Sequence, residues 1–115
     1  MYLWLDDVRP APDGWTLART AQEAIDLIDQ NGSKIEAVSL DHDLGASPDD
    51  GLFARGTSLE TGLDVARHIA KTLPFALDTP IRLHTWSPVG AQNMQWALEA
   101  AGYRPVIAAY RVGES

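Results

Sequence analysis

Short apolar runs are separated by longer amphipathic segments along the chain. The runs at residues 2–5, 35–40, 81–84 and 105–110 predict buried strands, and residues 15–19 predict a weaker one. Each run stops at polar or turn-forming residues. The pattern therefore predicts five strands.

Three helices are predicted between these strands. The first begins with a capping box, in which the Thr20 hydroxyl and the Glu23 carboxylate satisfy each other's free backbone amides. The second begins after Thr57 or Thr61, which are rival caps, and the third begins at Ser87-Pro88. We expect Trp4 and Trp96 in the core, together with the side chains that recur at helical spacing: Ala21, Ala24, Ile25 and Ile28 in the first helix, Leu63, Ala66, Ala70 and Leu73 in the second, and Ala91, Met94, Leu98 and Ala101 in the third.

Strands that alternate with helices indicate an α/β fold with a parallel sheet, which we expect to be covered on both faces. In such sheets ligands bind outside the carboxyl ends of the strands. The length of 115 residues predicts one domain over 1–115. Within it, residues 44–57 are predicted to form a long, mobile loop and residues 111–115 a tail.

The composition excludes several classes of protein. The chain has no cysteine, which excludes a disulfide scaffold, a thiolate metal site and a cysteine nucleophile. No apolar run reaches about 18 residues, so we expect a cytoplasmic protein with no membrane partner. Nine Lys plus Arg against sixteen Asp plus Glu give a net charge of −7, which argues against an extensive nucleic-acid surface.

Acidic residues and histidines gather where three of the predicted strands end. The first strand is followed by Asp6-Asp7, the third by Asp41-His42-Asp43, and the fourth ends in His84-Thr85. In a parallel sheet these residues share one edge, where neighbouring carboxylates repel one another unless a cation intervenes. Oxygen ligands without thiolates suit a hard divalent ion, Mg²⁺ or Mn²⁺. The predicted metal ligands are Asp6, Asp7, Asp41 and Asp43.

Three further residues are candidates for binding a phosphate. The helix that starts at Ser87 presents free backbone amides to the same edge, and the Thr85 hydroxyl could reach the same oxygens. Arg9 follows the first acidic pair closely enough to contact a phosphate. Ser87 and Arg9 also have a purely structural alternative, because Ser-Pro is a good helix start and Arg beside acids is an ordinary ion pair.

These motifs resemble the cyclic-phosphate-processing receiver-like family, a variant of the receiver domain of two-component response regulators. The matching segments are residues 5–10 (LDDVRP), 39–45 (SLDHDLG), 61–62 (TG) and 84–94 (HTWSPVGAQNM). The resemblance implies a flavodoxin-like three-layer sandwich with a five-stranded parallel sheet, reduced after the first strand. It places Asp41 at the position of the receiver phosphoacceptor, and it marks His42, Asp43 and His84 as additions of the variant family.

The chain departs once from the pattern of this family and once from that of signalling receivers. Ser87 stands where the family commonly has Asn before the proline. The lysine that signalling receivers carry at the end of the fifth strand has no match, since the two lysines are Lys34 and Lys71. The second departure weakens a role in phosphorelay.

The sequence and the resemblance together predict a metal-dependent phosphoesterase for cyclic phosphates. Asp41, His42 and His84 are the predicted catalytic residues, with either histidine as general acid or base and Asp43 orienting a histidine or joining the metal. The expected partner is a small phosphorylated ligand or an RNA end with a 2′,3′-cyclic phosphate, while the oligomeric state stays open. The alternatives are a signalling receiver phosphorylated on Asp41 and a binding module without turnover.

Overall fold

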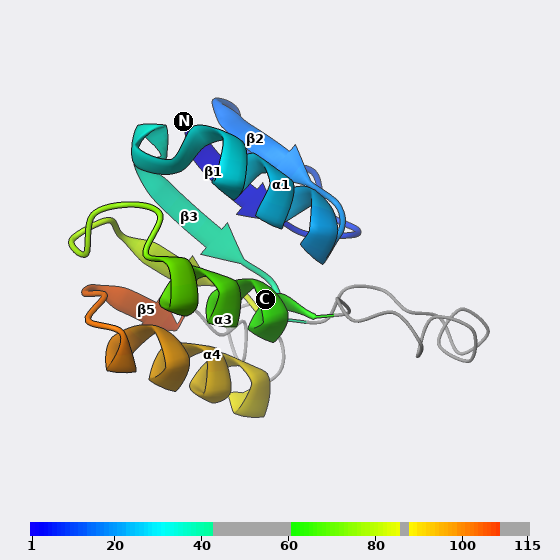
Figure 1. The fold of residues 1–115 in the computed structure, drawn as a ribbon. Coiled ribbons are helices and arrows are strands. Elements are labelled where there is room, and N and C mark those ends of the chain that lie inside the picture. The colour runs from blue at the N-terminus through cyan, green and yellow to red at the C-terminus, as the bar shows by residue number, and fades with distance from the viewer. Residues whose placement is uncertain (43–60, 86–87, 109–115) are drawn as a thin grey trace.

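The computed structural model describes residues 1–42, 61–85 and 88–108 of the chain, and the statements below concern these residues. Two predicted segments, the loop at 44–57 and the tail at 111–115, lie outside them. In chain order the elements are β1 (Tyr2–Leu5), β2 (Trp15–Ala18), α1 (Ala21–Asn31), the 3₁₀ helix η1 (Gly32–Lys34), β3 (Ala37–Leu40), α3 (Gly62–Thr72), β4 (Ile81–Leu83), α4 (Pro88–Ala100) and β5 (Val106–Ala108) (Figure 1).

The five strands form one parallel sheet in the order β2-β1-β3-β4-β5. This confirms the predicted α/β architecture and gives the strand order of a receiver-like, flavodoxin-like fold. The register aligns the last residues of the three central strands, because Leu5 pairs with Leu40 and Leu40 with Leu83. Whatever follows these three leucines is therefore brought to the same edge of the sheet.

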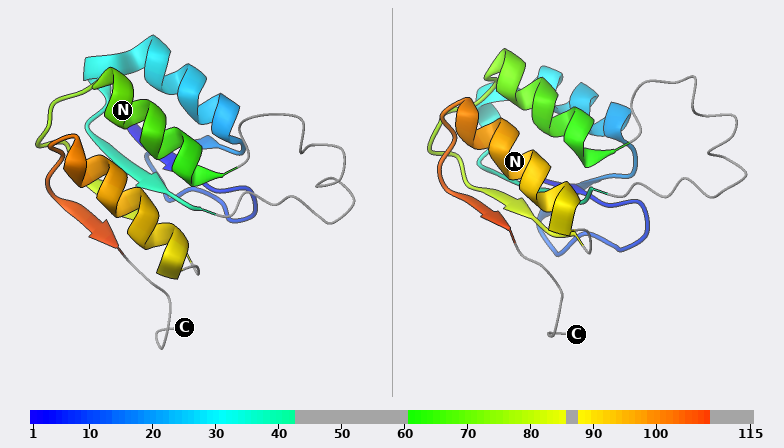
Figure 2. Two further views of the ribbon diagram at one scale, coloured as in Figure 1. Left: turned by 60° about the horizontal axis from the view of Figure 1, so that its bottom comes forward. Right: turned by 90° about the horizontal axis from the view of Figure 1, so that it is seen from below.

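The described helices lie on one face of the sheet. Helices α1, α3 and α4 lie side by side, with α3 in contact with both of the others (Figures 1 and 2). We expected helices on both faces. The crossovers from β2 to β3, β3 to β4 and β4 to β5 all run in the same direction across the sheet, and right-handed connections in one direction leave their helices on one side. Only the step from β1 to β2 runs the other way, and residues 6–14 contain no helix.

The opposite face of the sheet carries aromatic and polar side chains. Trp4 packs edge to face against Trp15 with ring centroids 5.6 Å apart, and Trp15 packs against Tyr2 at 5.3 Å. Tyr2 and Ile107 are exposed there, and so is Arg82. Trp4 is thus half-buried on this open face rather than enclosed in a core between two layers of helices.

The core lies between the sheet and the three helices. The side chains that were predicted to form the buried faces of α1 and α4 are buried, except for Ala101, the last residue of the α4 set, which is half-buried. The predicted stripe of α3 was wrong in part: Val65 and Ile69 are fully buried with Ala66, whereas Leu73 ends the helix in a left-handed conformation and is half-exposed. Trp96 was also placed wrongly, since it lies opposite the buried stripe of α4 and is 60% exposed.

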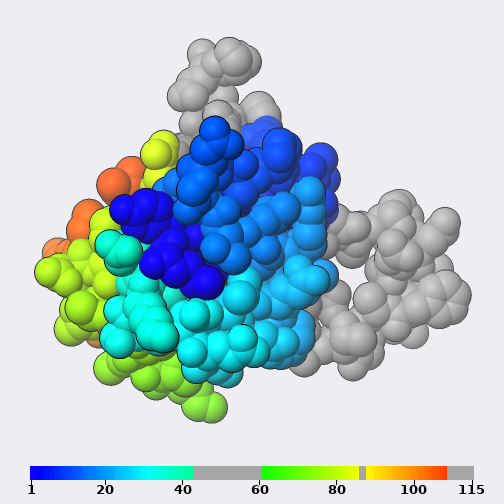
Figure 3. Space-filling model, turned by 90° about the horizontal axis from the view of Figure 1, so that it is seen from above, coloured from blue at the N-terminus to red at the C-terminus, as the bar shows by residue number. Residues whose placement is uncertain are grey.

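Hydrogen bonds hold the start of α3 and the start of the chain. Thr61, not its rival Thr57, precedes α3: its hydroxyl accepts from Leu63 N at 3.2 Å, and the Asp64 carboxylate accepts from the Thr61 amide at 3.2 Å. The terminal amine of Met1 donates to the carbonyl of Lys34 at 2.8 Å, and Figure 3 shows the start of the chain packed against the segment around η1. None of the helices in the described part of the chain has the length and apolar character needed to cross a membrane.

Candidate functional site

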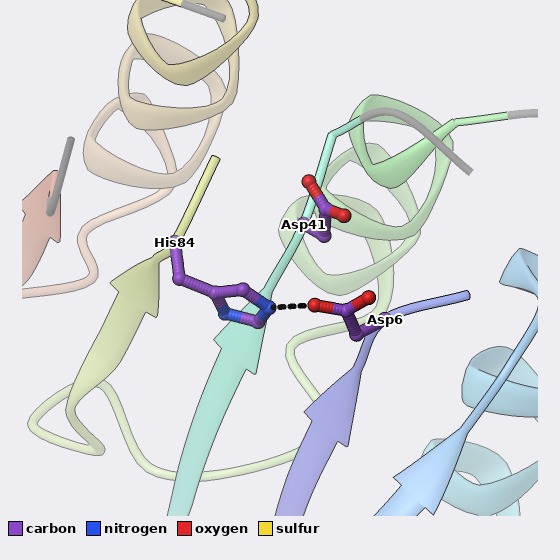
Figure 4. Close-up of side chains that lie close together, drawn as sticks. All are labelled: Asp6, Asp41 and His84. Atoms are coloured by element: carbon purple, nitrogen blue, oxygen red, sulfur yellow. Dashed lines mark hydrogen bonds and ion pairs between the residues drawn. The ribbon is translucent and has the colours of Figure 1, made fainter. Parts of the chain in front are cut away.

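Asp6, Asp41 and His84 lie next to one another at the carboxyl edge of the sheet. Each directly follows one of the three aligned leucines, and backbone bonds extend the pairing by one more step: Asp41 N donates to Leu5 O at 3.1 Å and His84 N to Leu40 O at 2.9 Å. One potential ligand atom from each of the three side chains lies within 4.8 Å of the other two. In Figure 4, His84 and Asp6 point toward each other, and Asp41 lies beside them at the end of β3.

The carboxylate of Asp6 is held by several hydrogen bonds. Its Oδ1 accepts from the backbone amides of Val8 and Arg9, both at 2.9 Å, which closes a tight turn after β1. Its Oδ2 lies 3.2 Å from Nε2 of His84. The residue is 3% exposed, and Oδ2 has one described hydrogen bond where Oδ1 has two, which leaves acceptor capacity on Oδ2.

The imidazole of His84 is buried and contacted on three sides. Its Nδ1 lies 2.6 Å from Oγ of Ser39, opposite the nitrogen that meets Asp6. Its ring stacks on Trp4 with centroids 4.1 Å apart and planes at 14°. His84 is 5% exposed and Ser39 is fully buried, so the ring has one defined orientation.

Two glycines allow helices to start against this edge. A Cβ on Gly62 would overlap the carbonyl oxygen of Asp41, and the Gly62 amide donates to the His42 carbonyl at 2.9 Å. A Cβ on Gly90 would lie 2.5 Å from Cγ of His42, so the His42 ring lies directly on the first turn of α4. The residues after β3 therefore contact both helix starts: the backbone of Asp41 and His42 lies against α3, and the His42 ring lies against α4.

The family model described as cyclic-phosphate processing receiver domain matches residues 1–100. The chain belongs to this family. A comparison with curated proteins and one with solved structures each found no match. The family assignment agrees with the resemblance of the strand-end motifs and with the receiver-like strand order.

The receiver domain brings some of the predicted site residues together. Asp6, Asp41 and His84 form one group, which Asp7 and His42 do not join among the described residues. Arg9 is half-buried in the turn closed by Asp6.

Three other predicted site residues lie further along the chain from the ends of the central strands. Thr85 is 1% exposed and directly follows His84. Asp43 and Ser87 lie outside the described residues, so their predicted roles stay predictions.

Sequence reasoning missed two neighbours of this group. Arg19 directly follows β2, and its guanidinium donates to the carbonyls of Asp6 at 3.4 Å and Arg9 at 3.2 Å. Its position as the last residue of the predicted strand at 15–19 was an available signal. Ser39 and Asp41 are two residues apart, so their side chains are expected on the same face of the sheet. The contact of Ser39 with His84, however, could be predicted only from the strand order, which the sequence pattern does not provide.

The group fits a divalent cation. The carboxylates of Asp6 and Asp41 are donors that divalent metals accept, and Mg²⁺ needs only one or two direct carboxylates with water and phosphate for the rest.

Proposed function

We propose that this receiver domain is a metal-dependent phosphoesterase that hydrolyses cyclic phosphodiesters, such as the 2′,3′-cyclic phosphate of a nucleotide or an RNA end. The observation that supports it most is the meeting of Asp6, Asp41 and His84 within 4.8 Å at the edge of a parallel sheet. Ligands of open α/β folds bind at this edge. The description of the family supports cyclic phosphates as the substrate class.

The carboxylates of Asp6 and Asp41 are the described groups that would hold the metal ion, with Asp7 and Asp43 as further candidates. A divalent ion bound there supplies positive charge to the phosphoryl oxygens and lowers the pKa of bound water. Asp6 contributes through Oδ2, because Oδ1 already accepts two backbone hydrogen bonds. Asp41 is half-buried, so its carboxylate is less enclosed than that of Asp6.

Hydrolysis requires two proton transfers that side chains of this chain can perform. Water adds to phosphorus and loses a proton, the ring P–O bond breaks, and the leaving oxygen gains a proton. An imidazole is suited to both transfers near neutral pH, and the candidates are His84 and His42. Arg9, Thr85 and Ser87 are proposed to bind the non-bridging oxygens.

The test is a hydrolysis assay with a panel of 2′,3′-cyclic and 3′,5′-cyclic nucleotides, with Mg²⁺, with Mn²⁺ and with EDTA. We expect turnover that EDTA abolishes and that falls by about 100-fold or more in Asp41→Asn and His84→Ala. Asp13→Asn and His68→Ala are matched controls, since both residues lie outside the group at the strand ends. Equal turnover in the wild type, Asp41→Asn and His84→Ala would overturn the assignment.

A second candidate function is phosphorylation of Asp41 itself. The position of Asp41 at the end of the central strand β3, in a receiver strand order, favours it. Incubation with a small phosphodonor would then add the mass of one phosphoryl group, and Asp41→Asn would lose it. Metal binding without turnover of any substrate and without this mass gain would leave a binding module.

A further inference from the structure

Three side chains on the open face of the sheet meet beside the candidate site. Trp4 comes from β1 and His84 follows β4, and β3 lies between these strands. Strands two places apart are about 9.5 Å from each other, yet the two rings stack at 4.1 Å. The residue of β3 beside Trp4 is Ser39, whose small side chain leaves the room in which the rings meet.

Two hydrogen-bond partners of His84, Asp6 and Ser39, bear on which ring nitrogen carries the proton. The carboxylate of Asp6 can only accept, so the bond at Nε2 requires a hydrogen on that nitrogen. In the neutral ring Nδ1 is then an acceptor, and the Ser39 hydroxyl donates to it at 2.6 Å. Both bonds and the stack on Trp4 favour the same orientation of the ring.

We propose that Ser39 and Trp4 are positioning residues that hold His84 as an Nε2–H donor facing Asp6. In this form Nε2 has no lone pair for a metal ion. The arrangement therefore assigns His84 to proton transfer and leaves metal binding to the carboxylates. The role of His84 in proton transfer rests on the proposed phosphoesterase function, whereas the tautomer and the orientation of its ring do not.

The first experiment measures the ring directly. Two-bond ¹H–¹⁵N correlation spectra of the ¹⁵N-histidine-labelled protein distinguish the two tautomers, and His84→Ala identifies the signals of His84 among the three histidines. We expect Nε2 of the metal-free wild type to be protonated and Nδ1 to show the shift of a hydrogen-bonded acceptor. A protonated Nδ1 in the neutral ring, or signals averaged between the tautomers, would overturn the proposal whether or not the domain is an enzyme.

The second experiment uses variants. In Ser39→Ala we expect the acceptor shift at Nδ1 to disappear and kcat to fall about 10- to 100-fold with little change in KM, as when a partner behind a functional histidine is removed. Trp4→Leu should give a second set of His84 ring signals, which Trp4→Phe should not, and Trp96→Leu is the control for loss of an exposed indole.

The outcomes separate the two proposals. The expected ring spectra without turnover of any substrate would reject the phosphoesterase function and keep the positioning role. Turnover in Ser39→Ala equal to the wild type, with unchanged ring spectra, would show that Ser39 only fills space. If Ser39→Ala does not fold, the wild-type spectra still test the Nε2–H form of His84, and Trp4→Leu tests the stacking contact.

Discussion

Replacing Gly62 with alanine tests how tightly α3 is seated on the end of β3. Helix propensity alone predicts that Gly62→Ala stabilises the protein by up to about 1 kcal/mol. The structure predicts the opposite, because the added Cβ would overlap the Asp41 carbonyl oxygen and lie 2.9 Å from the Asp41 carbonyl carbon and 3.1 Å from the His42 Cα. All three neighbours are backbone atoms, so no flexible side chain can move aside.

The expected magnitude follows from these two opposing effects. Overpacking in a rigid environment costs about 1–3 kcal/mol, and here the upper end applies because the helix or the strand end must shift as a unit. After subtraction of the propensity gain, we expect the free energy of unfolding to fall by about 2 kcal/mol. The shift also displaces Asp41, so the Mn²⁺ binding that we propose for this group, measured by calorimetry, should weaken.

The assay is urea unfolding followed by far-UV circular dichroism, with Gly14→Ala as the control. Gly14 has φ +88° and no atom within 4 Å of its added Cβ, so Gly14→Ala reports the cost of left-handed backbone without any overlap. It should lose about 1 kcal/mol and keep its affinity for Mn²⁺. A Gly62→Ala variant as stable as the wild type, with unchanged Mn²⁺ binding, would refute the reasoning.

Two further predictions concern the core. Burial raises the pKa of Tyr103 above its ordinary value of 10, and its hydroxyl donates to the Phe75 carbonyl at 3.0 Å. The folded state therefore holds this proton more tightly than the unfolded chain, so stability from Tyr103 is present below pH 10 and is lost as the pH rises above it. Tyr103→Phe should be about 1 kcal/mol less stable than the wild type at pH 7, and urea titrations from pH 8 to 11 should show this gap narrowing; parallel curves would contradict the argument. Met94→Ala should lose about 2–5 kcal/mol because Met94 is fully buried, whereas Trp96→Ala should change the free energy of unfolding by less than about 0.5 kcal/mol, and similar losses in both would contradict the placement of α4.

The sequence pattern predicted the parallel sheet and the meeting of acidic residues and a histidine at one edge of it, because the strand ends of such a sheet lie side by side. Asp6, Asp41 and His84 could be singled out before their distances were known. The contact between Asp6 and His84 could not, since it depends on β3 lying between β1 and β4. Ser39 was missed for the same reason, as its partner is 45 residues away.

Two errors had local causes. In α3, Leu63 and Leu73 fit helical spacing as well as Val65 and Ile69 do, and only packing against the sheet fixes which side of the helix is buried. The open face of the sheet could not be recognised from β1, because Tyr2–Leu5 is a continuously apolar run of the kind that strands buried on both faces have. Only in the structure do its buried leucines alternate with the exposed Tyr2 and the half-buried Trp4.

The candidate site forms only when the three central strands are aligned at their last leucines, so it depends on the whole fold. Asp6 and His84 are 78 residues apart, and a slip of one residue in either strand pair would turn its side chain to the other face. During synthesis Asp6 emerges early, yet it has no imidazole partner until the fourth strand has been made and docked. A ligand that contacts all three side chains therefore binds only the finished sheet, and its binding energy adds directly to the stability of the native chain.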